Sequence, residues 1–443
     1  MPSADPPGRA PDTIAAIATP PGRGAIGIVR VSGSDAPEIA RRLLGSLPRP
    51  RIATLAGARN ANGELLDEGL ALYFPAPHSY TGEQAFEFHG HGGLMVLQSV
   101  LAACVDAGAR LAEPGEFTRR AFLNGRLDLA QAEAVADLID AASREAARSA
   151  LRSLRGEFSA AVNALVAQLV ELRALTEAML DFPDDDVDKL HRDAATARLR
   201  RVRGALDEVL AKSRQGSLLR SGVQVVLAGR PNVGKSSLLN RLAGEERAIV
   251  TSIPGTTRDA LREPIQIEGV PLTVIDTAGL RPSSDVVERL GIERTQRELE
   301  QADIVIVVFD AGEPYAPLDE VPAGTALIEV YNKIDLVPGF SATGGAVAVS
   351  AKTGAGLDAL KSAILRVAGW SATGETVFLA RERHLRALQR ATAHLDAATH
   401  ELQRWELFAE ELRLAQMALA SIAGEFSADD LLGEIFSRFC IGK

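Results

Sequence analysis

The sequence predicts a multidomain α+β fold: a small N-terminal α+β domain, an all-α domain split along the sequence, and an α/β domain inserted between its halves. Three kinds of residue pattern along the chain support this division. Short apolar runs alternate with turn residues up to about residue 120, and residues 222–370 alternate strands with helices. The two stretches that flank the α/β region are rich in Ala, Leu, Arg and Glu at helical spacing.

Composition sets the broad class of the protein. The 443 residues suggest about three domains, and 46% hydrophobic residues are enough for sizeable cores. Two distant cysteines, Cys104 and Cys440, exclude a disulfide framework and a four-cysteine zinc site. With a net charge of −10, no secretory stretch at the start and no continuous apolar run long enough to span a bilayer, we expect a soluble cytoplasmic protein without a membrane partner.

The N-terminal domain is expected over residues 1–120. Its strands are predicted at Ala25–Val31, Leu70–Phe74 and Ala85–Phe88, separated by segments rich in Gly and Pro. Val96–Gly108 is predicted to be a helix that ends at its glycine.

The helical domain is expected to combine residues 121–217 with residues 375–443. Each half carries apolar residues at helical spacing, which predicts one buried face per half. These residues are Leu165, Leu169, Leu172, Leu175 and Met179 in the first half, and Leu385, Leu388, Leu395 and Leu402 in the second. Neither half closes a core alone, so we predict one domain built from both, into which residues 218–374 are inserted.

The alternation of strands and helices in the inserted domain predicts a parallel sheet covered by helices. Its strands are predicted at Val223–Leu227, Leu272–Ile275, Ile304–Phe309, Ala326–Tyr331 and Val347–Val349.

The first strand of this domain is followed by a phosphate-binding motif. The segment Gly229–Ser236 reads GRPNVGKS, which fits GxxxxGK[ST] and stands between a strand and a helix, as the motif requires. Its backbone N–H groups and the helix N-terminus favour phosphate. Lys235 is expected to reach the β- and γ-phosphates, and the Ser236 hydroxyl to bind Mg²⁺.

Three further motifs follow in the order of a guanine-nucleotide domain. Asp276-Thr277-Ala278-Gly279 places a carboxylate near the metal and a glycine N–H near the γ-phosphate. Asn332-Lys333-Ile334-Asp335 offers a carboxylate to the N1–H and 2-amino group of guanine, a donor pair that adenine lacks. Ser350-Ala351-Lys352 is expected beside the base, and Thr256 and Thr257 are candidates for the threonine that completes Mg²⁺ coordination.

The residues leave the hydrolytic group open. Leu280 occupies the position where Ras-type GTPases place the glutamine that orients water, and a hydrocarbon cannot do this. Glu288 and Asp285 are equal candidates by spacing. Asn232, inside the phosphate loop, could help to hold a monovalent cation beside the phosphates.

Seven segments of the chain form one recognisable set: GRPNVGKSSLLN, TSIPGTTRD, DTAGLRPSSDVVERLGIER, the terminal FCIGK, and, near the N-terminus, TPPGRGAIGIVRVSG, YTGEQAFEFHGHGG and EPGEFTRRAFLNGRLDLAQAEAV. Together they closely resemble the MnmE (TrmE) family of tRNA-modification GTPases. The resemblance covers essentially the whole chain. It implies an N-terminal tetrahydrofolate-binding and dimerisation domain, a split helical domain and an inserted P-loop GTPase domain.

The resemblance also implies an activity. The family acts as a homodimer with the flavoprotein MnmG, in a heterotetramer, and adds an aminomethyl or carboxymethylaminomethyl group to C5 of the wobble uridine (position 34) of certain tRNAs. It uses GTP, Mg²⁺, K⁺ and a 5-formyl- or 5,10-methylene-type tetrahydrofolate.

Site residues carried over by motif form four groups: a catalytic residue, metal ligands, folate contacts and nucleotide contacts. Glu288 would orient the attacking water. Mg²⁺ would be held by Ser236 and Thr257, and K⁺ by Asn232, Thr251, Ile253 and Thr256. Folate would contact Arg30, Glu87, Arg126 and Lys443. The nucleotide would contact Asn232, Val233, Gly234, Lys235, Ser236, Ser237, Thr251, Ser252, Ile253, Pro254, Gly255, Thr256, Thr257, Asp276, Thr277, Ala278, Gly279, Asn332, Lys333, Asp335, Ser350, Ala351 and Lys352.

Other features have two interpretations each. Cys440 is either a reactive thiol or a buried packing residue, and the packing role is favoured because its neighbours are apolar. His89 and His91 without a third ligand suggest a loop near a binding site and no metal. Two helical arginine clusters are expected to be solvated faces with a lesser chance of touching tRNA, namely Arg198, Arg200, Arg201 and Arg203, and Arg381, Arg383, Arg386 and Arg390. An Era/Der-type ribosome-assembly GTPase is the alternative function.

Overall fold

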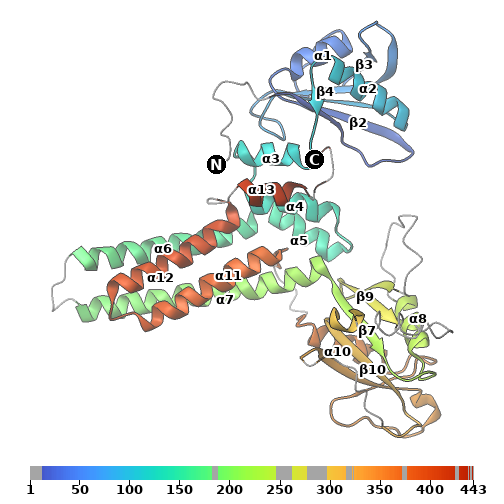
Figure 1. Ribbon diagram of the computed structural model, residues 1–443, viewed down its shortest axis with the longest axis vertical. Helices are drawn as coiled ribbons and strands as arrows, with labels where there is room; N and C mark the ends of the chain where they lie inside the picture. Colours follow the sequence, from blue (N-terminus) through green and yellow to red (C-terminus); the bar gives the residue numbers. More distant parts are fainter. Residues whose placement is uncertain are drawn as a thin grey trace. The chain divides into compact units, whose positions relative to one another are not determined.

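The computed structural model describes residues 12–181, 188–245, 262–276, 297–315, 322, 324–371, 377–424, 429–437, 439 and 442. It divides into two compact units, Met1–Ala136 with Ala420–Lys443, and Asp137–Leu419. Figure 1 shows their helices and strands, many of them labelled.

The first unit is built on a six-stranded mixed sheet in the order β3-β4-β5-β2-β1-β6. β6 pairs in parallel with β1, and the other neighbours are antiparallel. The strands are β1 (Ile14–Ile17), β2 (Gly24–Ser32), β3 (Thr54–Arg59), β4 (Leu65–Phe74), β5 (Ala85–Gly92) and β6 (Arg110–Leu111).

Two helices, α1 (Ala36–Leu44) and α2 (Leu94–Asp106), pack on one face of this sheet. Their core contains Phe86 and Phe88 from β5 and Cys104 from α2, all fully buried. Burial raises the pKa of the Cys104 thiol to about 12, so this cysteine is an inert packing residue.

The predicted strands of this domain are confirmed as β2, β4 and β5, and the predicted helix as α2. β1, β3, β6 and α1 were not predicted. β1 reads IAAI, and alanine is a weak strand former, so its strand character comes from pairing on both sides.

A buried ion network holds α3 (Glu116–Leu123) in the first unit. Arg120 contacts Glu116 at 2.8 Å and Glu83 at 3.1 Å, and Arg110 contacts Glu116 at 2.5 Å. Burial acts to raise the pKa of Glu116, but hydrogen bonds from Arg110, the Glu113 N–H and Arg120 lower it overall. Glu116 is therefore held as a carboxylate.

The helical elements come from both sides of the inserted domain, as predicted. α7 and α11, separated by the inserted domain along the chain, pack side by side (Figure 1). The elements are α4 (Leu129–Ile139), α5 (Arg144–Leu154), α6 (Glu157–Asp181), α7 (Asp188–Ser221), α11 (Glu382–His400), α12 (Trp405–Ala423) and α13 (Asp429–Ser437).

The predicted apolar stripes are largely buried. Leu165, Leu169 and Leu172 are at most 2% exposed on α6, whereas Leu175 and Met179 are half-buried. On α11, Leu388 and Leu395 are fully buried and Leu385 is half-buried. The prediction was wrong for Leu402, because α11 ends at His400 and a turn precedes α12.

Among the described helices, α6 is long and apolar enough to cross a membrane by length and composition alone. Its buried leucines and its packing against α7 are those of a core helix.

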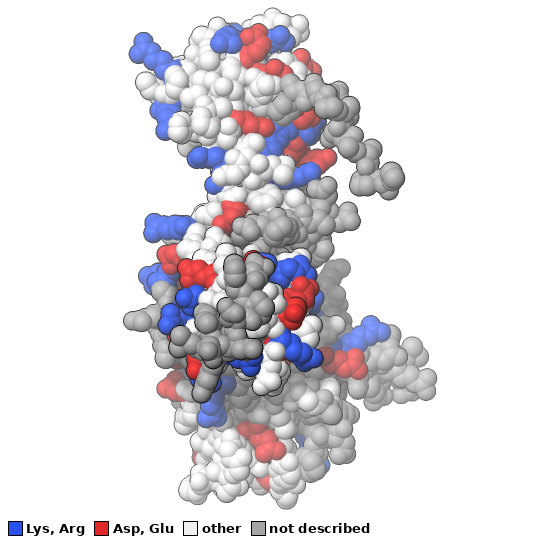
Figure 2. Space-filling view, turned by 90° about the vertical axis from the view of Figure 1, so that its left-hand side faces the viewer, with Lys and Arg blue, Asp and Glu red and all other residues white. Residues whose placement is uncertain are grey.

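The basic clusters were predicted to be solvated faces. Arg198, Arg200 and Arg201 are exposed, as expected. Arg203 instead pairs with Asp396 at 2.7 Å, and the prediction was wrong for Arg381, whose side chain is 13% exposed and pairs with Asp137. On the face in Figure 2, the coloured basic and acidic side chains are interspersed.

The inserted domain contains a second six-stranded sheet, in the order β12-β11-β10-β7-β9-β8. The predicted parallel strands are confirmed, whereas β8 was missed and pairs antiparallel to β9 at the edge. Its Pro264 suits an edge strand. The strands are β7 (Val223–Ala228), β8 (Arg262–Ile267), β9 (Val270–Asp276), β10 (Ile304–Asp310), β11 (Ala326–Asn332) and β12 (Val347–Ala348).

α8 (Lys235–Glu245) and α10 (Leu357–Val367) contribute to one apolar core of this domain, and the 3₁₀ turn η2 (Ile334–Leu336) follows β11. The same core includes Ala146 and Ala150 of α5, so α5 packs on the inserted domain.

Candidate functional site

The phosphate loop lies between β7 and α8, and two of its glycines have backbone conformations that disfavour other residues. Gly229 has φ +142° and Gly234 has φ +95°. A Cβ on Gly229 would lie 2.4 Å from the Val308 carbonyl oxygen, and one on Gly234 would lie 2.3 Å from Nδ2 of Asn332. The loop therefore has this shape only with glycine at both positions.

Lys235 begins α8 and lies inside this loop. It is 5% exposed, and its ammonium donates to the carbonyl oxygens of Gly229 at 2.8 Å and Arg230 at 2.9 Å. The cation is thus placed within the concave turn of backbone where a phosphate would lie.

Ser236 and Asp276 bring two oxygen groups together at the end of the loop. The Ser236 hydroxyl donates to Oδ2 of Asp276 at 2.5 Å, and Asp276 is fully buried at the end of β9. A hydroxyl and a carboxylate are the ligand types that Mg²⁺ takes in proteins.

Asn332 connects the phosphate loop to the base-binding motifs. Its Nδ2 donates to the Val233 carbonyl oxygen at 2.9 Å, and its Oδ1 accepts from the Ala351 N–H at 3.0 Å. The side chain is 2% exposed. One buried amide therefore fixes three separate motifs in one arrangement.

The carboxylate predicted to recognise guanine is held by its neighbours. The Ser350 hydroxyl donates to Oδ1 of Asp335 at 2.6 Å and itself accepts from the Thr353 N–H at 3.1 Å. Asp335 lies in η2, directly after the Asn332 turn.

Lys333 has a partner that sequence reasoning missed. It has φ +65°, and its ammonium contacts Asp310 at 2.7 Å, at the end of β10. Burial acts to raise the pKa of Asp310, but the hydrogen bonds from Lys333 and the Gly312 N–H lower it overall. The ion pair joins the end of β10 to the turn after β11. The sequence signal that could have predicted this contact is Asp310, which ends the strand next to the one that ends at Asn332, just before Lys333.

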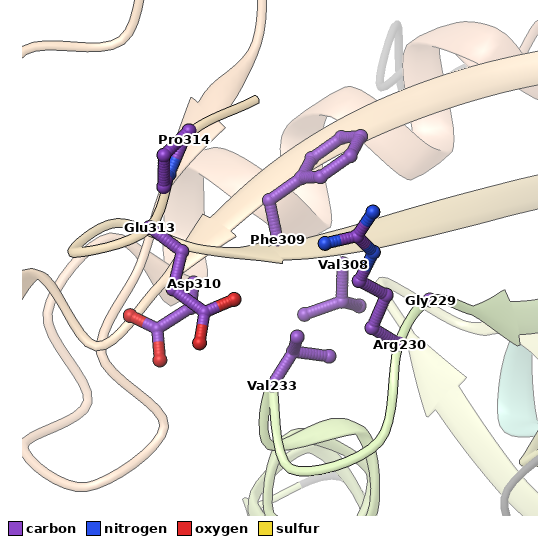
Figure 3. Close-up of a pocket in the computed structure, with 8 residues that line it drawn as sticks. All are labelled: Gly229, Arg230, Val233, Val308, Phe309, Asp310, Glu313 and Pro314. Atoms are coloured by element: carbon purple, nitrogen blue, oxygen red, sulfur yellow. The ribbon is translucent and has the colours of Figure 1, made fainter. Parts of the chain in front are cut away.

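A pocket lies beside the phosphate loop, between that loop and the end of β10 (Figure 3). The carboxylates of Asp310 and Glu313 lie on one side of the view and the guanidinium of Arg230 on the other. The pocket therefore adjoins the phosphate loop.

Part of the predicted nucleotide site lies outside the described residues. Lys352 and Ser237 follow the described motifs and are exposed. The remaining positions are outside the described ranges, so their roles stay predictions: Thr251, Ser252, Ile253, Pro254, Gly255, Thr256, Thr257, Thr277, Ala278, Gly279 and Glu288, with its competitor Asp285.

In the first unit, Arg30 and Glu87 are cross-strand neighbours on β2 and β5. Nε of Arg30 contacts Oε1 of Glu87 at 2.8 Å, and Nε2 of His89 contacts its other oxygen at 2.9 Å. Burial acts to raise the pKa of Glu87, but the charge of Arg30 and the His89 hydrogen bond lower it overall. His91 contacts Asp67 at 2.7 Å, so the two histidines have separate carboxylate partners.

Aromatic rings enclose the Arg30 guanidinium. Its Cζ lies 5.5 Å from the ring centre of Tyr80 and 5.7 Å from that of Phe117, within the range of a cation–π contact. Nη1 of Arg30 also donates to the Gly442 carbonyl oxygen at 3.4 Å. Tyr80 was not predicted as a site residue, although it is the first residue of the family-like segment YTGEQAFEFHGHGG.

Arg126 is placed by the turn that carries Tyr80. A Cβ on Gly82, which has φ +81°, would lie 3.2 Å from Cγ of Arg126, and Nδ2 of Asn124 donates to the Thr81 carbonyl oxygen at 2.7 Å. The structure thus brings Arg30 and Glu87 together and sets Arg126 on the adjoining turn. Cys440 and Lys443 lie outside the described residues.

Known proteins match this chain over nearly all of its length. The family model described as "GTP-binding protein TrmE N-terminus" matches residues 13–126, and the model "MnmE helical domain" matches residues 129–440. The "tRNA modification GTPase MnmE" of Azoarcus sp. (strain BH72) is 61% identical over 446 residues, covering 98% of this chain and 99% of that protein. The protein of the same name in Aromatoleum aromaticum is 58% identical, covering 98% of each.

Among solved structures, the G domain of the T. maritima FeoB iron transporter is 29% identical, covering 33% of this chain and 98% of that chain, with a TM-score of 0.26. The full-length relatives and the two family models, in contrast, span both the N-terminal and the helical segments. The chain therefore belongs to the MnmE family.

Proposed function

We propose that this protein is a potassium-dependent GTPase that modifies tRNA. With an MnmG-type flavoprotein it adds a carboxymethylaminomethyl or aminomethyl group to C5 of the wobble uridine (position 34) of certain tRNAs. A 5-formyl- or 5,10-methylene-type tetrahydrofolate supplies the one-carbon unit. The observation that carries the proposal is the 61% identity, over 98% of the chain, to a protein named tRNA modification GTPase.

The geometry of the inserted domain fits GTP. Lys235 lies inside the phosphate loop, and Asn332 fixes that loop against Ala351 and the turn of Asp335. In this arrangement the carboxylate of Asp335 accepts from N1–H and the 2-amino group of guanine. The loop glycines leave the backbone N–H groups free of side-chain bulk toward the phosphates.

The donor groups also fit two metal ions. Ser236 and Thr257 would hold Mg²⁺, and the Ser236 hydroxyl beside the Asp276 carboxylate supports this assignment. Asn232, which has φ +65° in the loop, would hold K⁺ with Thr251, Ile253 and Thr256. Both cations would offset the negative charge that develops on the phosphates during hydrolysis. Glu288 would orient the attacking water.

The aromatic-lined pair Arg30–Glu87 supports a folate site. A pterin ring offers donors and acceptors on one edge and a flat face, which match a carboxylate, a guanidinium and the Tyr80 ring. Arg126 and Lys443 would complete the contacts, and Cys440 stands near the end of the chain, at a position compatible with chemistry or with packing.

The proposed organisation follows from these sites. Residues 1–120 form the folate-binding and dimerisation domain, residues 121–217 with 375–443 the helical domain, and residues 218–374 the GTPase domain. The working assembly is a cytoplasmic homodimer in a heterotetramer with the flavoprotein, which binds tRNA.

Mass analysis of tRNA nucleosides tests the proposal. Cells that lack this protein should lose the C5-modified wobble uridines, and the wild-type chain should restore them. Lys235→Ala should fail to restore them, whereas Lys212→Ala, on α7, should restore them fully. Unchanged wobble uridines in the cells lacking the protein would overturn the proposal.

A further inference from the structure

The chain makes two connections between the helical and inserted domains, and both belong to the compact unit Asp137–Leu419. It enters the inserted domain where α7 ends at Ser221 and β7 begins at Val223. It leaves after α10 and returns at the start of α11, next to α7 (Figure 1).

One carboxylate, that of Asp137, pairs with an arginine at each of these two connections. Asp137, near the end of α4, accepts from Nε of Arg220 at 2.9 Å and from Nη2 of Arg381 at 2.8 Å, both on Oδ1. Its Oδ2 accepts from Nε of Arg381 at 3.3 Å. Arg220 lies in the last turn of α7, and Arg381 is the N-cap residue of α11. A third helix thus holds the entering and the leaving chain together.

This ion pair is shielded from water. The side chains of Asp137 and Arg381 are 6% and 13% exposed, whereas the Arg203–Asp396 pair between the same helices, α7 and α11, has 27% and 57% exposed side chains. Removing the charge of Asp137 would leave two guanidiniums without the shared carboxylate. Arg220 is 37% exposed and can be hydrated, whereas Arg381 would be left as a largely buried, uncompensated charge, which is costly.

A second attachment lies one turn earlier on α7. Nε2 of Gln215 donates to the Gly369 carbonyl oxygen at 2.5 Å, and its Oε1 accepts from the Ser371 N–H at 3.0 Å. At the next position, a Cβ on Gly216 would lie 1.6 Å from the Phe378 carbonyl oxygen. The leaving chain therefore lies directly on the α7 backbone, and only glycine allows this approach.

The described residues on either side of the second connection are thus held in place, Gly369 and Ser371 by Gln215, and Arg381 by Asp137. A displacement of the inserted domain would then move α7 and α11 as one body. We propose that Asp137 is a positioning residue that transmits the nucleotide state of the inserted domain to the helical domain. The inference rests on the proposed function only where its test measures wobble-uridine modification.

The test compares full-length wild type, Asp137→Asn and the matched control Asp396→Asn. Hydrogen exchange is followed by mass spectrometry with GDP and with a non-hydrolysable GTP analogue. In Asp137→Asn, peptides that cover residues 212–224 and 366–385 should exchange on the order of tenfold faster, while β10 and β11 keep their protection. Nucleotide-dependent differences on α7 and α11 should be present in wild type and in Asp396→Asn, and absent in Asp137→Asn.

Activity separates positioning from simple loss of structure. GTP turnover of Asp137→Asn should stay within about twofold of wild type, while wobble-uridine modification falls about tenfold, the size expected when about 1.4 kcal/mol of coupling is lost. Gln215→Ala should also lower wobble-uridine modification more than GTP turnover, but by a smaller factor. In the double variant, the loss of modification should be smaller than the sum of the two single losses in free energy.

Three results would overturn the inference. Two come from exchange: nucleotide-dependent differences on α7 and α11 that persist in Asp137→Asn, or their absence from the wild type. The third is a parallel fall of turnover and modification, because that is the signature of a structural defect. If wild-type protein modifies no tRNA, the proposed function fails, and the exchange comparison still decides the role of Asp137.

Discussion

Asn332, at the end of β11, donates its side-chain amide to the Val233 carbonyl oxygen at 2.9 Å, and so joins the base-binding edge of the sheet to the phosphate loop. The same amide accepts from Ala351. Asn332→Ala would leave the buried Val233 carbonyl unpaired, at about 1–3 kcal/mol, and would also remove the partner of the half-buried Ala351 N–H. We expect guanine-nucleotide affinity to fall by at least tenfold, as measured by titration with a fluorescent GDP. Asn62→Ala, in an exposed turn, is the matched control, and equal affinities for the two variants would contradict the role of Asn332.

The base preference should depend on one carboxylate. Asp335→Asn replaces an acceptor of two donors with an amide, which fits xanthine, whose 2-carbonyl accepts a hydrogen bond. Affinity should fall for GTP and rise for XTP, since a site built to hydrogen-bond a group rejects analogues that leave it unpaired by factors of about 10⁴. Competition binding measures the ratio of affinities. A ratio unchanged from the wild type would exclude Asp335 from base recognition.

The monovalent cation should act through the phosphate loop. GTP turnover should be much faster in KCl than in NaCl at equal ionic strength, and Asn232→Ala should remove this difference while Mg²⁺-dependent nucleotide binding persists. Steady-state phosphate release in the two salts measures the effect. Equal wild-type rates in both salts would show that the loop holds no functional potassium.

Acid should weaken the first unit through Glu116. Its pKa is lowered in the folded protein, so its contribution to stability is complete above the unfolded pKa of about 4.3 and disappears as pH falls through the lower folded value. At pH 7, Glu116→Gln should lower the free energy of unfolding by about 3 kcal/mol. The difference from wild type should shrink below about pH 4.

Thermal unfolding measured from pH 3 to pH 8 provides the comparison. Glu113→Gln, an exposed neighbour, should match wild type throughout. A Glu116→Gln deficit that stays constant down to pH 3 would show that charge is not what stabilises this network.

The sequence predicted the sites where chemistry fixes the residue type. Lys235, Asp276 and Asp335 stand in motifs whose spacing defines a fold context, and the structure places them on one edge of the second sheet. Periodicity likewise predicted the buried stripe of α6, because a helix core face repeats.

Contacts between distant segments could not be predicted. Asp310 beside Lys333, Tyr80 over Arg30 and Asp137 between two arginines have no local signature, because each depends on elements that only folding brings together. The strand β8 was missed for a related reason. Its short sequence gains its strand character from pairing with β9.

The split of the helical domain has a consequence for how the chain is made. α7 leaves the ribosome long before its neighbour α11, and the whole inserted domain is synthesised in the interval. The inserted domain has every strand of its sheet by Ala348, so it can fold first, as domains generally do during synthesis. Once folded, it brings the ends of α7 and α11 close and shortens the loop that the helical domain must close. The helical domain therefore completes its folding after the inserted domain has already brought α7 and α11 together.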